Sequence, residues 1–175
     1  MSKREREFDF DENWNVPESI SFSSIYSVEN RKKSIMHPLF NNERSDIETS
    51  FINYLESPNK VEWWFKNGDR DAIYFAVPYE EDGKKKPFYV DFIVRLKDGT
   101  IGLFDTKSGL TKQVAGPKVD GLHTYIREQN KKGKKIFGGI VTNTNNRKYA
   151  GRWVYFNKDG KELTGKLDNW TTLDF

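Results

Sequence analysis

Apolar residues recur at helical spacing in one early segment of the chain. Ser45 is followed three residues later by Glu48, which is the pattern of a capping box at the start of a helix. The apolar positions after it lie three or four residues apart: Ile47, Phe51, Tyr54 and Leu55. We therefore predict a helix over residues 45–55 that is ended by Pro58.

The middle of the chain changes to aromatic and β-branched runs separated by turn residues, a pattern typical of strands. Four such runs predict an antiparallel meander: Val61–Lys66, Ala72–Tyr79, Phe88–Leu96 and Thr100–Lys107. The segments expected to turn between them are Asn67-Gly68, Glu80–Lys86 and Lys97-Asp98-Gly99.

The last third predicts a second helix and two more strands. The helix is expected to begin with Pro117 in its first turn and to run out at Lys131-Lys132-Gly133. Ile136–Val141 is wholly apolar, as expected of a strand buried on both faces. Arg152–Phe156, followed by a turn over residues 158–161, predicts a final hairpin. This order of elements indicates an α/β fold, with a mixed β-sheet flanked by helices.

Residues 1–42 are polar, weakly periodic and without a motif of their own. Scattered aromatic residues indicate a segment that packs onto the rest of the chain: Phe8, Phe10, Trp14, Phe22 and Tyr26. For a chain of 175 residues, we expect an N-terminal extension over 1–42 and one domain over 43–175.

The amino-acid composition limits the kinds of functional site that the chain can have. The chain has a mean hydropathy of -0.82, yet its 13 Phe, 8 Tyr and 5 Trp can build a core. The absence of a long apolar run or secretory signal favours a soluble, cytoplasmic protein without a membrane partner. With no cysteine and two distant histidines, zinc is disfavoured and any metal must be held by oxygen. No phosphate-binding loop of the nucleotide hydrolases is present.

Charge is unevenly distributed along the chain. Residues 41–110 carry 10 basic and 13 acidic side chains, whereas residues 111–175 carry 13 basic and 6 acidic ones. Such segregation suits a protein that holds a cation beside an extended polyanion. A solvated lysine-rich surface is the alternative explanation.

The turn between the last two predicted strands of the meander decides which side chains face each other. If Asp98-Gly99 forms a two-residue hairpin, Asp91 and Asp105 lie on opposite faces of the sheet. If the loop is Lys97-Asp98-Gly99 with a left-handed glycine, the two aspartates face each other and Lys107 shares their side. We prefer the three-residue loop because it also pairs apolar residues of the two strands.

Facing carboxylates about 4.5–5.5 Å apart repel each other unless one is protonated or a cation lies between them. Mg²⁺ typically takes one or two carboxylates with waters and phosphate oxygens, so Asp91 and Asp105 are candidate ligands. Lys107 could then orient a water nucleophile. The alternative is an ordinary amphipathic hairpin with solvent-facing Asp and Lys, and Asp-x-Lys also occurs at Asp82 and Asp159. Glu48 likewise has two interpretations, a water-mediated contact to the metal or the capping box alone.

These residues, with the segments around them, resemble the PD-(D/E)XK nuclease superfamily, which has the restriction-endonuclease-like fold. The resemblance is greatest to the C-terminal nuclease region of type III restriction enzyme subunits and related helicase-nuclease proteins, and it covers roughly residues 43–142. The segments that carry it are Trp63–Gly68, Val77-Pro78-Tyr79, Phe88–Val94 and Leu103–Gly109. Val90 departs from the proline that is usual in the family before the first aspartate.

The resemblance implies a metal-dependent DNA endonuclease whose products carry a 5′-phosphate and a 3′-hydroxyl. Asp91 and Asp105 would bind Mg²⁺, with Mn²⁺ able to substitute, Lys107 would position the attacking water, and Glu48 would support the metal. A helicase or other ATPase of a restriction system is the implied partner, and two copies could pair. The competing hypothesis is a catalytically silent nucleic-acid-binding module of the same fold that serves a partner ATPase.

Several basic residues are candidate contacts for DNA phosphates, and each has a solvated lysine or arginine as its alternative. They are Lys112, Lys118, Lys134, Lys135, Arg147 and Lys148.

Overall fold

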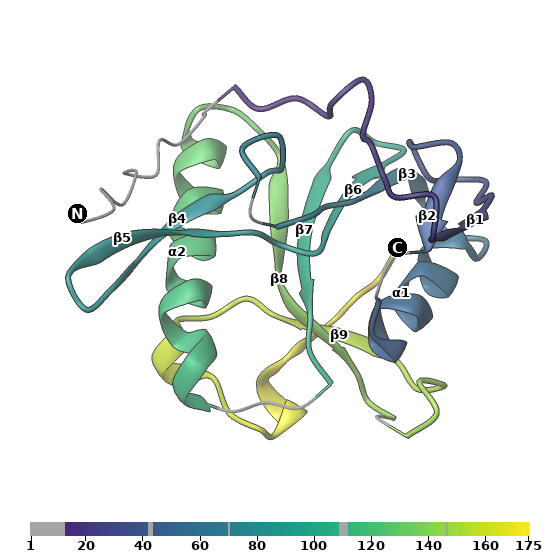
Figure 1. The fold of residues 1–175 in the computed structure, drawn as a ribbon. Coiled ribbons are helices and arrows are strands. Elements are labelled where there is room, and N and C mark those ends of the chain that lie inside the picture. Colours follow the sequence, from purple (N-terminus) through teal and green to yellow (C-terminus); the bar gives the residue numbers. More distant parts are fainter. Residues whose placement is uncertain (1–12, 42–43, 70, 109–111, 146) are drawn as a thin grey trace.

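The computed structural model describes residues 13–41, 44–69, 71–108, 112–145 and 147–175. Its centre is a six-stranded mixed sheet in the order β10-β9-β8-β7-β6-β3. The helix α1 (Asp46–Glu56) covers one face of this sheet and α2 (Lys112–Lys131) covers the other (Figure 1). The expected class, a mixed α/β sheet flanked by helices, is confirmed.

The central sheet combines a hairpin with a crossover. Its strands are β3 (Val61–Lys66), β6 (Phe92–Leu96), β7 (Ile101–Thr106), β8 (Ile136–Asn143), β9 (Trp153–Phe156) and β10 (Thr171–Thr172). β7 and β8 are parallel and are joined through α2, whereas the other neighbouring strands are antiparallel. The carboxyl-terminal ends of β7 and β8 therefore lie at the same end of the sheet (Figure 1).

The first helix forms as its sequence predicts. Ser45 is the N-cap of α1, and its side chain and that of Glu48 satisfy each other's backbone N–H groups in a capping box. The buried face of the helix consists of Ile47, Phe51, Ile52 and Leu55. Phe51 packs edge-on against Phe92 and Phe104 from β6 and β7, which fixes the helix over the sheet.

Side-chain alternation divides the core between the two faces. Phe92 and Phe104 lie with α1, whereas Ile93 and Leu103 lie with Leu122 of α2. Phe92, Phe104 and Leu122 are fully buried. Ile93 and Leu103 are 4% and 3% exposed. Because odd-numbered residues of β7 face α2, Asp105 must do so as well.

The predicted four-strand meander is wrong in one respect. β3 pairs directly with β6, and the intervening chain forms a separate two-stranded arm of β4 (Val77–Glu81) and β5 (Lys84–Phe88). The segment expected to be a long turn contains most of this hairpin, whose own turn has Asp82 and Gly83 at φ 53° and 69°. Three successive lysines in β5 hide the strand from a search for hydrophobic runs.

Two other boundaries also differ from expectation. α2 begins five residues before Pro117, which therefore lies inside the helix instead of at its first position. The predicted final hairpin is absent, since a 3₁₀ turn over Gly160–Glu162 comes after β9 and the strand that pairs with β9 is β10. The intervening chain also forms a 3₁₀ turn at Leu167–Asn169.

The N-terminal segment packs against the sheet. Within it, β1 (Ser27–Glu29) pairs with β2 (Leu39–Asn41), and Ser34 forms an isolated bridge with Trp64 of β3. Trp14 packs near Phe65 and Phe75, while Phe8 and Phe10 lie outside the described residues. The domain boundary at 42/43 stays a prediction. In the described parts of the chain, neither helix combines the length and apolar character needed to cross a bilayer.

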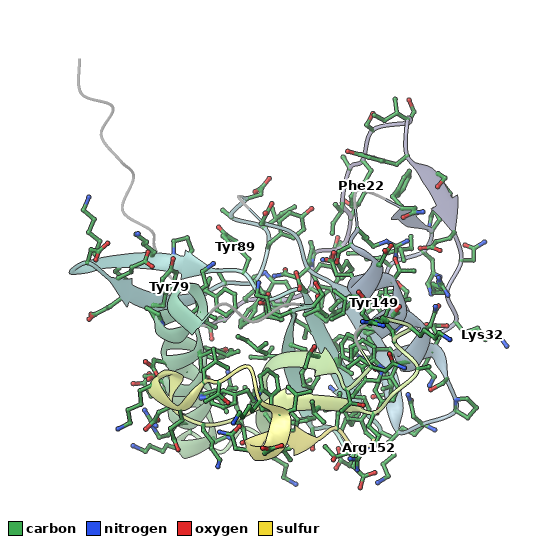
Figure 2. All side chains as sticks on the ribbon, turned by 90° about the horizontal axis from the view of Figure 1, so that it is seen from below. Phe22, Lys32, Tyr79, Tyr89, Tyr149 and Arg152 are labelled. Atoms are coloured by element: carbon green, nitrogen blue, oxygen red, sulfur yellow. The ribbon has the colours of Figure 1, made fainter. Side chains whose placement is uncertain are left out.

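Gly121 of α2 provides a test of how the β4-β5 arm is held. A Cβ at this position would lie 2.5 Å from the Cβ of Tyr79 and 2.7 Å from the carbonyl oxygen of Pro78. Figure 2 shows Tyr79 beside the helix. We expect Gly121→Ala to lower the free energy of unfolding by about 1–3 kcal/mol, because the arm must shift.

The matched control is Gly116→Ala in the same helix, where the nearest atom to a new Cβ is 3.8 Å away. It should be neutral or stabilising by up to about 1 kcal/mol, the gain in helix propensity. Urea denaturation measures both variants, and equal effects would contradict the close packing of the arm on α2.

Candidate active site

The hairpin of β6 and β7 adopts the three-residue loop. Leu96 N–H donates to Thr100 O at 2.9 Å, Gly99 N–H donates to Leu96 O at 2.9 Å, and Gly99 has the left-handed φ of 87°. Phe92 pairs with Phe104. The three-residue loop is therefore confirmed, and this register continued by one residue would align Asp91, in the bend before β6, with Asp105; the facing of their carboxyl groups stays a prediction.

Asp105 is the most deeply placed charged group of the site. The residue is 4% exposed, and its Oδ2 atom has no hydrogen-bond partner. Lys107 Nζ lies 3.1 Å from that oxygen, an ion-pair distance without the alignment of a hydrogen bond. The side chain of Lys107 is 40% exposed, so this ammonium connects the buried carboxyl group to solvent.

Asp91 lies in the bend that leads into β6 and is anchored by the facing strand. Its Oδ2 accepts hydrogen bonds from both the backbone N–H and the hydroxyl of Thr106, each at 2.8 Å. Its backbone carbonyl accepts from Asn67 N–H at 2.9 Å. These contacts fix the carboxylate at the edge of the sheet and leave Oδ1 directed toward a second cation.

That cation is Lys66, which the sequence alone does not single out. Its Nζ lies 2.9 Å from Glu48 Oε1 and 3.8 Å from Asp91 Oδ1, and it donates to Asn67 O at 3.1 Å. The ammonium also lies 5.2 Å from the centre of the Phe92 ring. The pairing of β3 with β6, which places Lys66 opposite Phe92, is the signal that could have found it.

Glu48 forms the predicted capping box, while its contact to a metal stays a prediction. Oε2 accepts from the N–H and hydroxyl of Ser45, and Oε1 accepts from Lys66, so both oxygens are engaged. Although burial acts to raise it, the pKa of Glu48 is lowered by Lys66 and by the hydrogen bonds from Ser45. A metal contact from Glu48 therefore requires that Lys66 move away.

The carboxyl group of Asp105 is poised between its charged and neutral forms. Burial and the negative charge of Asp91 raise the pKa of Asp105 to about 7, against the opposing effect of Lys107. Burial acts to lower the pKa of Lys107, but Asp105, Asp91 and Glu48 together raise it. The cluster of three carboxyl groups and two ammonium groups is charge-balanced when Asp105 holds its proton.

Asp91 and Asp105 fit a magnesium ion that takes two carboxylates and completes its shell with water. The Oδ2 of Asp105 supports this fit, because its charge partner is the partly exposed Lys107 and no hydrogen bond holds it. Across the described ranges, however, no group of three or more His, Asp or Glu side chains is arranged to hold one ion. The fit is thus to two carboxylates, without Glu48.

Four of the candidate phosphate contacts lie at opposite ends of the strands of the central sheet. Arg147 and Lys148 are exposed in the loop between β8 and β9, at the edge where Lys107 N–H donates to Val141 O at 3.0 Å. Lys134 and Lys135 lie at the far edge, where Ile101 N–H donates to Lys135 O. The length of β7, 6 residues, separates these edges by roughly 20 Å, so the second pair is not part of the surface around the site.

The remaining two candidates lie on α2. Lys118 is near enough to Asp105 to act against the rise in its pKa, and its Nζ lies 5.5 Å from the centre of the Phe88 ring. Lys112 begins the helix, but its side chain lies outside the described residues.

Comparison with known proteins gives one match. The profile of a family described as the YagJ family matches residues 24–161, which is most of the chain and contains the whole carboxylate cluster. No curated protein and no solved structure matches the sequence.

The raised pKa of Asp105 predicts a pH dependence of stability in the metal-free protein. Between about pH 4 and pH 7 the folded protein holds a proton that the unfolded chain has released, so stability falls as the pH rises through this window. Asp105→Asn should remove this decrease. Relative to the parent, the variant should gain on the order of 2 kcal/mol between pH 5 and pH 8, because each unit of pKa shift is worth about 1.4 kcal/mol.

Urea denaturation in EDTA at the two pH values measures this difference. Asp159→Asn, at an exposed aspartate, is the matched control. If the parent and Asp105→Asn lose stability in parallel between pH 5 and pH 8, Asp105 does not carry the shifted proton.

Proposed function

The chain belongs to the YagJ family, and we propose that it is a Mg²⁺-dependent DNA endonuclease with a restriction-endonuclease-like fold. The observation that carries the proposal is that Lys107 lies beside the buried carboxyl group of Asp105, whose pKa is raised by burial and by the charge of Asp91 at the same end of the sheet. The order of elements supports it, since a helix with Glu48, the β6-β7 hairpin, a second helix and a parallel strand succeed one another as the resemblance implies.

Asp91 and Asp105 would hold the metal in this proposal. The bound ion would supply charge neutralisation at the phosphate and a water of lowered pKa. Asp91 is preorganised for this task by its two hydrogen bonds from Thr106. Asp105 must give up its proton, and its pKa of about 7 means that this occurs at near-neutral pH.

Lys107 is the residue proposed to position the attacking water. Its Nζ is held beside Asp105, yet 40% of its side chain is exposed, so it can donate to a water at the mouth of the site. Attack by this water on the phosphorus would break the bond to the 3′ oxygen of the preceding nucleotide. A 5′-phosphate and a 3′-hydroxyl would remain.

The site belongs, in our proposal, to a larger restriction or helicase-nuclease system of the cytoplasm. Such a system would supply a partner helicase or ATPase, because the sequence has no phosphate-binding loop of its own. Cleavage of both DNA strands would need a second copy or two successive events.

A second candidate function is a nucleic-acid-binding module of the same fold without turnover. Lys66 favours this alternative, because its ammonium already forms ion pairs with Glu48 and Asp91 without a metal. In that case the basic loop at the site edge would dock DNA for a partner ATPase.

Nicking of supercoiled plasmid with Mg²⁺ or Mn²⁺ separates the two functions. The parent should nick, Asp105→Ala should reduce the rate to background, and Lys107→Ala should reduce it by about 10²-fold or more, the usual effect of losing one preorganised donor. Asp159→Ala and Lys161→Ala change the same spacing of residues at exposed positions and serve as matched controls. An inactive parent would favour the binding module, and activity that survives both site substitutions would contradict the proposed site.

DNA affinity tests the surface around the site. Replacing Arg147 and Lys148 by alanine should weaken binding and reduce the slope of log affinity against log salt by about one for each phosphate that is no longer bound. The same change at Lys134 and Lys135 removes equal charge from the far edge and should leave both quantities nearly unchanged. Fluorescence anisotropy at several salt concentrations measures them, and equal effects from the two pairs would refute the assignment.

A further inference from the structure

A small cavity adjoins the carboxylate cluster on the side of the N-terminal segment. Its volume is about 190 Å³, and it lies between that segment and the end of β3. The walls are largely aromatic and apolar, with Phe22, Met36 and Phe40 on one side and Tyr74 on the other. Figure 2 shows Phe22 on the part of this segment that projects beyond the body of the domain.

Lys66 lies between the cavity and the candidate active site. This residue lines the cavity, and its Nζ also lies 2.9 Å from Glu48 Oε1 and 3.8 Å from Asp91 Oδ1. A DNA strand with a phosphate at Asp91 would therefore present an adjacent nucleotide to the cavity.

The walls of the cavity are held in place by specific contacts. The rings of Phe22 and Phe40 stack with centres 5.0 Å apart and planes 15° apart. Asn67 donates to the carbonyl oxygens of Phe75 and Val90 and accepts from Phe75 N–H, which fixes the chain at the end of β3. Tyr74 lies against Gly68 so closely that a Cβ there would be 2.4 Å from its ring.

We propose that this cavity binds one unpaired base of the DNA strand that is cleaved. The inference rests on the proposed function, since it takes the ligand at Asp91 and Asp105 to be a DNA strand. Every base has a flat face that stacks on aromatic side chains, and the wall offers such rings without a fixed hydrogen-bond code. The lining also contains the polar side chains of Glu18, His37 and Lys66, which suit the polar edge of a base.

The size of the cavity selects this occupant over larger ones. Drug-sized ligands fill pockets of about 300–1,000 Å³, so a cavity of about 190 Å³ suits a single ring system. A base within a duplex is stacked and paired and cannot enter without leaving the helix, which costs a few kcal/mol. The substrate class is therefore DNA with an unpaired nucleotide beside the cleaved phosphate, as in single strands, flaps or mismatches.

The test compares two DNA strands that carry the same phosphates. One is a single-stranded DNA of about 12 nucleotides, within the length that one single-strand binding site covers, and the other is a strand of equal length in which every base is replaced by an abasic site. Binding is measured by fluorescence anisotropy in EDTA, so that no cleavage occurs. The parent should bind the natural strand about tenfold more tightly, within the range expected for stacking of one base.

Phe22→Ala and Phe22→Leu should both remove most of this ratio, because leucine keeps the apolar bulk but loses the ring. Ile25→Ala, on the same segment at a side chain that is 82% exposed, is the matched control and should keep the ratio. A ratio near one in the parent would overturn the base pocket. A ratio that survives both Phe22 substitutions would overturn it too, since the base would then bind elsewhere.

The outcomes also separate this inference from the proposed function. If the parent nicks plasmid but shows no preference for the natural strand, the proposed nuclease is supported and the base pocket is contradicted. If the parent does not nick plasmid but prefers the natural strand in a way that depends on Phe22, the proposed nuclease is contradicted and the base pocket is supported. If neither strand binds, the base pocket is overturned, and if the parent also does not nick plasmid, the nuclease is overturned with it.

Discussion

The register of one hairpin determines the chemistry of this protein. Gly99 takes a left-handed conformation in the turn and Leu96 pairs with Thr100, so the hairpin brings Asp91 near enough to Asp105 for its charge to raise the pKa of Asp105. A shift of one residue would put the two carboxyl groups on opposite faces. The pKa of Asp105 is raised first by its burial under α2 and then by the charge of Asp91, and both depend on this register.

The charges around the pair explain how such a site persists in a folded protein. Lys107 offsets the charge of Asp105, and Lys66 offsets those of Glu48 and Asp91. The two ammonium groups differ in position, since Lys107 reaches toward solvent whereas the side chain of Lys66 is only 14% exposed. Lys66 also forms part of the aromatic cavity, so one side chain joins the carboxylates to the proposed base pocket.

Much of this arrangement could be predicted from the sequence, where local signals and tertiary packing agree. The capping box at Ser45 and the three-residue loop before Thr100 depend on short-range patterns, and both are present. The β4-β5 arm could not be predicted, because solvent-facing lysines erase the hydrophobic signal of a strand. Lys66 escaped prediction for a different reason, because its role depends on β3 pairing with β6 across the intervening β4-β5 hairpin, which no local pattern encodes.

Isothermal titration of the protein with Mn²⁺ at about pH 6.5, in two buffers of different ionisation enthalpy, tests the central claim most directly. The account predicts saturable binding with release of a proton from Asp105, because a carboxyl group with a pKa of about 7 is largely protonated at that pH. Asp105→Asn should abolish both signals, while Asp98→Asn in the distant turn should keep them. Absence of saturable binding, or binding that survives Asp105→Asn, would contradict a metal site at Asp91 and Asp105.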